Sequence, residues 1–299
     1  MFDLTPIYDF IARAIPLECM QVRFMQQAFI GIVLLAPMCA AMGVQVVNFR
    51  MAFFSDAISH SAFAGVAIGL LLAMNVRLSM LGLALLIGVM IVAVGRRSSL
   101  SIDTIIGVFF SAVVAFGLAV VSRERHIARD LQMFLYGDIL TIGNAEILWE
   151  AVLFVSLMAF QFFGYNRMLY VGLNPVLATA HRVRTRVYQY AYAALLSLVV
   201  IFSVWAVGVF LVTAMLIVPA ATARNLARSA AGMFWWSIVV GLTSAVAGLL
   251  ISAQPDVRTA TGATVILCAS VWFVISFIPT FVRRGASGRY PANGGSSGT

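Results

Sequence analysis

The sequence predicts an all-α protein, a polytopic bundle of about eight to nine transmembrane helices. Composition gives the first indication, because 62% of the 299 residues are hydrophobic and only 10% are charged, against about 25% charged in soluble proteins. The mean hydropathy of +1.01 gives the second. The third is a series of long stretches without Arg, Asp or Glu, which are typical of membrane spans.

Most of these uncharged stretches reach the roughly 18–20 apolar residues that cross about 30 Å of hydrocarbon. Lipid offers the backbone no hydrogen-bond partners, so each stretch should be a helix. The stretches are Phe24–Phe49, Ala57–Val76, Leu78–Gly95, Thr104–Ser122, Ala151–Asn166, Val187–Ala223, Ser229–Pro255 and Thr259–Val282.

Two stretches do not fit one crossing each. Val187–Ala223 would be about 55 Å long as a single helix, so we expect a break near Val207-Gly208 that makes two spans, the second of them short. Ala151–Asn166 is too short and needs residues from Glu146 onward. The prediction is nine crossings, with allowance for an irregular, half-buried seventh.

Charge predicts the orientation of the chain. There is no lysine, so the basic residues are 19 arginines. With the N-terminus outside, 12 of the 19 fall in inner segments and 9 of the 11 acidic residues fall in outer ones. Cytoplasmic loops are enriched in basic residues, so the C-terminus should be cytoplasmic. The same rule explains the net charge of +8, which therefore does not indicate nucleic-acid binding.

The predicted organisation has three parts. Residues 1–23 should form an interfacial N-terminal segment, which lacks the basic start of a signal peptide. Residues 24–282 should form the transmembrane domain, and the Gly/Ser-rich residues 283–299 a disordered cytoplasmic tail. Three cysteines, Cys19, Cys39 and Cys268, are expected to be small hydrophobic side chains without a metal or disulfide role.

Asp56 and His60 are the clearest candidate site, because charges within apolar spans are costly and often functional. They are four residues apart, so they share one helical face. A carboxylate and an imidazole suit zinc or another first-row divalent cation. Gly65 and Gly69 follow with the same spacing, which predicts close contact with a neighbouring helix.

A structural alternative is an Asp–His hydrogen bond that stabilises the bundle. Two ligands are also fewer than the four that zinc usually takes, although a two-fold dimer would supply two of each. Linear topology places Asp56 about one turn into the second span, near the inner side. A re-entrant connection over Gly43–Ser55 would raise the pair toward the midplane.

Other candidates are weaker. His126 lies in a predicted outer loop and fits a solvated or interfacial role. His181 lies in a basic inner run that fits a topology determinant, and Asp103 opens a span where N-capping explains it. The chain contains no phosphate-binding G-x-x-x-x-G-K-[ST] loop and no H-E-x-x-H, so we do not expect an enzyme.

Five segments along the chain carry short motifs that are informative as a set. They are Asn48–Gly69 with D-x-x-x-H and G-x-x-x-G, Ser101–Gly107 with D-T-x-x-G, Leu135–Leu140 with L-x-G-x-x-L, Val207–Ala223, and Thr261–Ile266. Together they resemble permease subunits of ATP-binding-cassette importers for zinc, manganese or iron, over nearly the whole chain. One region departs, because Asn174 and His181 stand where that family has an acid and a glycine.

The resemblance implies a type II ABC-importer-like permease in the cytoplasmic membrane of a prokaryote. It implies a homodimer or paralogous heterodimer of permeases, cytoplasmic ATP-binding-cassette ATPase subunits and an extracytoplasmic metal-binding protein. The ATP would bind to the partners, and no cofactor would be held permanently. By family motif, the zinc, manganese or iron ion would pass Asp56 and His60 by alternating access.

Coupling to the ATPase needs an inner surface, and the segment 222–232 is the best candidate. We expect a short helix directly after Pro219-Ala220-Ala221, which would place Arg224 and Arg228 on one face. The alternative is that the segment 222–232 is an ordinary basic loop. The candidate coupling residues are Thr222, Arg224, Asn225, Arg228 and Gly232.

Two rival functions remain open from the residues alone. An ion-coupled secondary metal transporter or channel would use Asp56 and His60 as a proton relay and would act without an ATPase. An intramembrane metal-dependent enzyme would need a third ligand and a positioned acid or base. Neither of these two groups is evident among the predicted spans.

Overall fold

All regular elements of the described chain are helices. The structure, a computed structural model, describes residues 5–14, 18–122, 142–173, 175–254, 256–257 and 259–287. The elements are α1 Thr5–Ala14, the 3-10 helix η1 Glu18–Gln21, α2 Arg23–Asn48, α3 Phe54–Leu71, α4 Val76–Gly95, α5 Ile102–Val121, α7 Asn144–Leu173, α8 Pro175–Ala180, α9 Thr185–Val207, α10 Val209–Leu226, α11 Ala230–Ser252 and α12 Thr261–Ser287.

Within the described residues, nine helices are long and apolar enough to cross a membrane, which confirms the predicted number of spans. They are α2, α3, α4, α5, α7, α9, α10, α11 and α12. The break near Val207-Gly208 is also confirmed. Gly208 alone separates α9 from α10, with φ 84° and ψ 164°, a backbone conformation that is essentially restricted to glycine.

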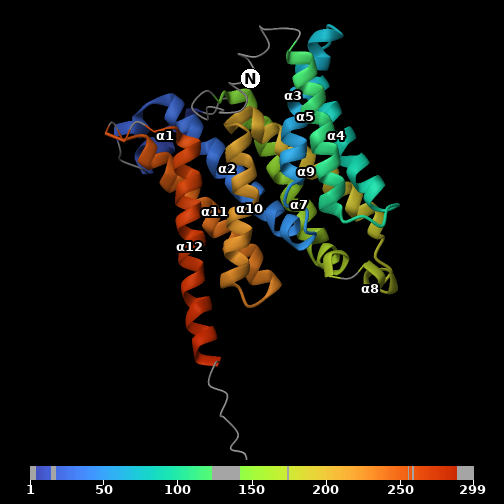
Figure 1. The fold of residues 1–299 in the computed structure, drawn as a ribbon. Coiled ribbons are helices and arrows are strands. Elements are labelled where there is room, and N and C mark those ends of the chain that lie inside the picture. The colour runs from blue at the N-terminus through green and yellow to red at the C-terminus, as the bar shows by residue number, and fades with distance from the viewer. Residues whose placement is uncertain are drawn as a thin grey trace, which may run out of the picture.

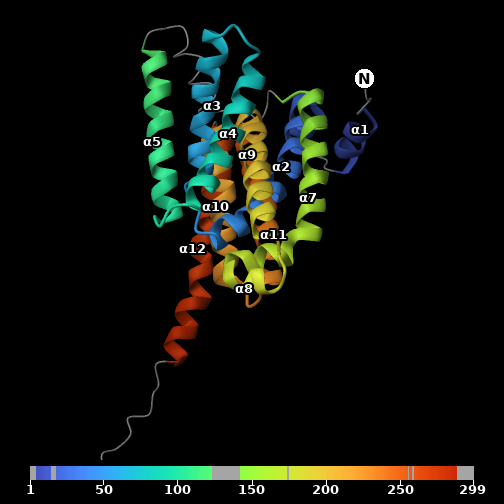
Figure 2. The ribbon, with the colours of Figure 1, turned by 90° about the vertical axis from the view of Figure 1, so that its right-hand side faces the viewer.

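The helices form a bundle with two distinguishable ends (Figures 1 and 2). The α3–α4 connection and α1 lie toward one end, which we name the α1 end. The short helix α8, the α10–α11 connection and the last residues of α12 lie toward the other, which we name the α8 end. Figure 2 shows α5 at one edge of the bundle and α7 at the opposite edge.

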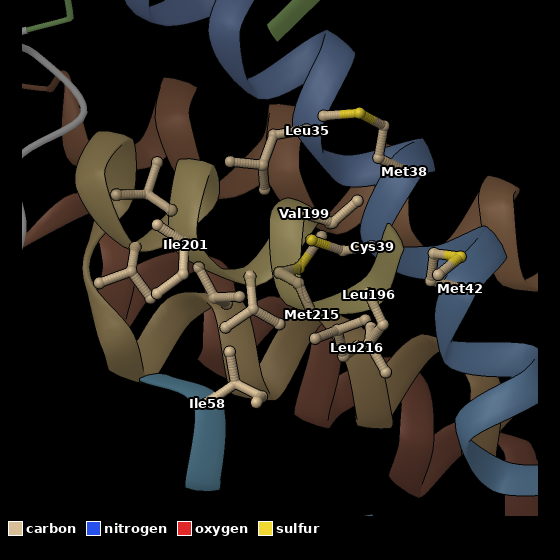
Figure 3. Close-up of a cluster of buried hydrophobic side chains, with 14 of the residues drawn as sticks. Leu35, Met38, Cys39, Met42, Ile58, Leu196, Val199, Ile201, Met215 and Leu216 are labelled. Atoms are coloured by element: carbon tan, nitrogen blue, oxygen red, sulfur yellow. The ribbon is translucent and has the colours of Figure 1, made fainter. Parts of the chain in front are cut away.

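The helix α2 lies at the centre, packed against α7, α10 and α11. Its span is 78% buried, the largest buried share among the nine. Figure 3 shows Leu35, Met38 and Cys39 of this helix beside side chains of α9 and α10. Cys39 is a free, fully buried thiol. This agrees with the prediction that it acts as a small hydrophobic side chain.

Glycines allow the closest helix contacts. A Cβ atom built on Gly43 of α2 would lie 1.9 Å from the carbonyl oxygen of Leu216 on α10, so only glycine fits there. Gly65 of α3 faces Met80 of α4, where an added Cβ would lie 2.6 Å from Cα. A Cβ added at Gly69, one turn later, would lie 3.1 Å from the Cα of Val76. The predicted helix contact of this glycine pair is thus present.

The connection between α2 and α3 differs from the re-entrant segment considered above. Helix α2 continues to Asn48, and α3 begins at Phe54, so residues 49–53 form a short turn. Both views show this turn short of the level that α8 reaches (Figures 1 and 2). The first turn of α3 is therefore set back from the α8 end without any re-entrant loop.

Two helices end at other residues than the sequence predicts. The helix α10 runs through Pro219 to Leu226, so no separate short helix begins after Ala221. A proline is tolerated inside a membrane helix because neighbouring groups satisfy the freed carbonyl. At the C-terminus, α12 extends to Ser287, so residues 283–287 of the predicted tail are helical.

Candidate metal site

Asp56 and His60 lie one turn apart at the start of α3, and both side chains are half-buried. Asp56 occupies the first turn of the helix, where the exposed backbone N–H groups favour a negative charge. The two side chains interact electrostatically. The structure therefore places the predicted pair together on one helical face.

Other helices complete the surroundings of the pair. The His60 ring packs edge-on against Phe110 of α5, with ring centroids 5.1 Å apart, and against Phe63 of its own helix at 5.3 Å. Thr213 of α10 is a hydrogen-bond partner of the Asp56 carboxylate. The site thus lies where α3, α5 and α10 meet.

Thr213 has two acceptors within reach of its one hydroxyl proton. It donates to the backbone carbonyl of Val209, one turn earlier on α10, at 2.8 Å, and it also serves Asp56. When the Thr213 hydroxyl donates to Val209, the Asp56 carboxylate is free to bind a cation and the hydroxyl still has an acceptor. In the sequence, the only indication of this contact is a polar residue within an apolar span.

The pair alone is an incomplete ligand set. Within the described residues, no group of three or more His, Cys, Asp and Glu side chains is placed to hold a metal ion. One copy of the chain offers one carboxylate and one imidazole, which suit a divalent transition metal in type but not in number.

The weaker candidates lie apart from this site. His181 is exposed beyond α8 and stacks on Tyr170, with ring centroids 5.4 Å apart. The N-cap of α5 is Ser101 and not Asp103, because the Ser101 hydroxyl accepts from the Thr104 N–H while Asp103 lies exposed in the first turn. His126 and the motif of Leu135–Leu140 lie outside the described residues.

The candidate coupling residues divide into two kinds. Thr222 is fully buried and bonds back to Val218, and Asn225 donates to Ser276 of α12 at 3.0 Å. Arg224 and Arg228 are exposed at the α8 end. They do not share a helical face as predicted, because α10 ends at Leu226 and Ala227 is extended.

The remaining candidate, Gly232, belongs to the first turn of α11. Its N–H donates to the Ser229 hydroxyl that caps this helix, at 3.1 Å. The structure adds one element that the sequence did not indicate. The separate helix α8 lies at the same end of the bundle (Figure 2), in the segment where Asn174 and His181 depart from the family pattern.

The chain has relatives of known name over almost its full length. It is 31% identical over 244 residues to the high-affinity zinc uptake system membrane protein ZnuB of Haemophilus influenzae, covering 82% of this chain and 93% of the relative. It is also 31% identical over 280 residues to the manganese transport system membrane protein MntC of Halalkalibacterium halodurans, covering 93% and 91%.

Solved structures share the fold. PsaBC from Streptococcus pneumoniae in complex with Fab matches with a TM-score of 0.74 and 27% identity, over 92% of this chain and 95% of that one. An inward-facing conformation of a putative metal-chelate type ABC transporter matches with a TM-score of 0.69 at 14% identity, which indicates the fold alone. Residues 21–280 match the ABC 3 transport family, and the chain belongs to that family.

Proposed function

We propose that this chain is the permease subunit of an ATP-driven importer that moves a divalent transition metal across the cytoplasmic membrane. The observation that carries the proposal is the Asp56–His60 pair, set between three membrane helices with Thr213 as a neighbour. The names of the relatives support the same class of cargo, since they include zinc and manganese systems and a probable iron transport system.

The metal ion would meet the pair from two copies of the chain. Phe110, which borders His60, belongs to α5, and the span of α5 is only 22% buried. A second permease packed on this side would bring another carboxylate and imidazole toward the same ion, which makes the four ligands that zinc prefers. Alternating access would then open the shared site to one side of the membrane at a time.

The Asp56–His60 pair does not by itself select among zinc, manganese and iron. Imidazole and carboxylate bind all three ions, and selectivity depends on geometry and on the remaining ligands. An extracytoplasmic metal-binding protein would deliver the ion, as the family resemblance implies.

The test of this function is metal uptake into proteoliposomes that contain the permease with its partner ATPase. We expect uptake of zinc or manganese only when ATP is present on the ATPase side. Equal uptake without ATP, or by the permease without the ATPase, would instead identify an ion-coupled transporter or channel.

We also propose that the α10–α11 connection contacts the ATPase and that the α8 end is cytoplasmic. The exposed Arg224 and Arg228 support this, together with the excess of arginine at this end. Replacing both with glutamate should uncouple ATP hydrolysis from uptake, because charge reversal opposes a complementary interface. Metal binding should be retained.

The measurement is the ratio of ATP hydrolysed to metal transported. A matched control is Arg97→Glu, a charge reversal at an exposed arginine after α4. If the double variant transports with the normal ratio, this connection does not couple the two subunits.

A further inference from the structure

A second polar feature is lined mainly by residues of α4, α7 and α9, and by none of the helices α3, α5 and α10 that meet at the candidate metal site. It is a cavity of about 390 Å³ near the α1 end, bounded by the first turns of α4 and α7 and by the last turns of α9. Its lining includes Arg77, Glu146, Trp149, Glu150 and Trp205. A volume of this size admits a small polar group.

Glu150 is the unusual residue of this cavity. Its side chain is only 4% exposed, and among the described residues the oxygen Oε2 has no hydrogen-bond partner. Gly31 of α2 lies beside it, and an added Cβ there would be in ordinary van der Waals contact with Oε2, at 3.6 Å. A carboxylate so enclosed is costly unless a cation or a hydrogen-bond donor accompanies it.

The one basic side chain in the lining does not fill that role. Arg77 pairs with Glu146 at 3.5 Å, and its guanidinium lies over the Trp205 ring, 4.4 Å from the centroid. Its side chain is 64% exposed. The cavity therefore presents an exposed guanidinium at its mouth and, in its interior, a carboxylate with one oxygen that lacks a hydrogen-bond partner among the described residues.

The depth of these groups matches the membrane interface. Glu150 is the seventh residue of α7, so it lies about 9 Å from the start of the helix. Arg77 is in the first turn of α4. The two tryptophans mark the same level, since tryptophan is enriched where headgroups meet acyl chains. Trp149 and Leu78 are exposed to the surroundings of the bundle, at 61% and 66%.

We propose that this cavity binds the headgroup of a phospholipid that carries a primary ammonium group, such as phosphatidylethanolamine. The ammonium would enter the cavity and donate to Glu150, while the phosphate would contact Arg77. The acyl chains would lie outside along Leu78 and Trp149. Charge complementarity selects this ligand, because its positive and negative groups match the two charges of the site in order of depth.

A divalent metal fits the cavity less well. Only Glu146 and Glu150 offer carboxylates, and the guanidinium of Arg77 lies beside one of them. A phosphatidylcholine headgroup fits less well too, because its quaternary ammonium has no N–H to donate. This inference rests on the chain spanning a membrane and does not depend on the proposed transport function.

The test compares lipid retention by the purified protein in native mass spectrometry, with phosphatidylethanolamine and phosphatidylcholine supplied at equal concentration. We expect the native chain to retain the ethanolamine lipid about tenfold more than the choline lipid. Glu150→Gln should bring this ratio close to one, and Arg77→Gln should weaken both lipids because both carry phosphate. Asp9→Asn, an exposed acid at the same end, should change nothing.

Equal retention of the two lipids by the native chain, or an unchanged ratio in Glu150→Gln, would overturn the proposal. A second measurement covers the case in which Glu150→Gln does not fold. The thermal transition of the native chain should then rise more with the ethanolamine lipid than with its N-trimethylated counterpart, and identical shifts would equally overturn it.

Discussion

Replacing either Asp56 or His60 with alanine should abolish metal uptake per assembled complex. Loss of an outer-shell partner typically costs about 10–100-fold in metal affinity, so loss of a direct ligand should exceed that range. Both residues are half-buried at the start of α3, and neither belongs to the fully buried core, so assembly should survive. The measurement is uptake in proteoliposomes, divided by the amount of complex with its ATPase bound.

Asp56→Asn separates the ligand role from a structural one. Asparagine keeps a hydrogen-bonding partner for Thr213 but removes the negative charge, so uptake should still be lost. Metal binding should also weaken as the pH falls through the range in which histidine takes up a proton, because only neutral imidazole donates its lone pair to a metal. If either alanine variant transports at the native rate, the pair is a bundle-stabilising contact.

Gly43→Ala should destabilise the protein by about 3 kcal/mol, the upper part of the usual range for overpacking. The added Cβ would lie 1.9 Å from the carbonyl oxygen of Leu216, a backbone atom that cannot turn aside as a side chain would. Helices α2 and α10 would have to separate in the centre of the bundle. The measurement is thermal unfolding in detergent, with the fraction of folded protein after extraction as a second readout.

Gly82→Ala is the matched control for this substitution. It is a helical glycine of α4 with nothing within 4 Å of an added Cβ. Here alanine should raise stability by about 0.5–1 kcal/mol, because it restricts the unfolded chain and favours the helix. The two variants should therefore shift the unfolding temperature in opposite directions, and a matching loss at both sites would refute the packing argument.

The spans could be predicted because lipid imposes one rule on every segment. Apolar length gave the number of crossings, and the break at Val207-Gly208 followed from a stretch too long to cross once. The spacing of Gly65 and Gly69 predicted a helix contact that the structure contains. The short helix expected after Pro219-Ala220-Ala221 is absent because α10 continues through Pro219, and a membrane bundle tolerates proline inside a helix.

The candidate site was only half predictable. The pair on α3 follows from local spacing, but Thr213 and Phe110 come from distant segments, and no periodicity reveals which helices meet. Glu150 shows the same limit, since nothing in its sequence position distinguishes it from Glu146. One turn separates the two, yet Glu146 pairs at the surface while Glu150 is 4% exposed.

The single-residue link at Gly208 has a mechanical consequence. Helix α9 packs along α4, whereas α10 carries Thr213 beside Asp56. With one residue between them, the two helices have almost no slack, so neither can turn about its own axis without twisting the backbone at Gly208. A rotation of α10 about its axis would therefore have to be absorbed at Gly208 or passed on to α9, and Thr213, beside Asp56, lies between the α8 end of α10 and this joint.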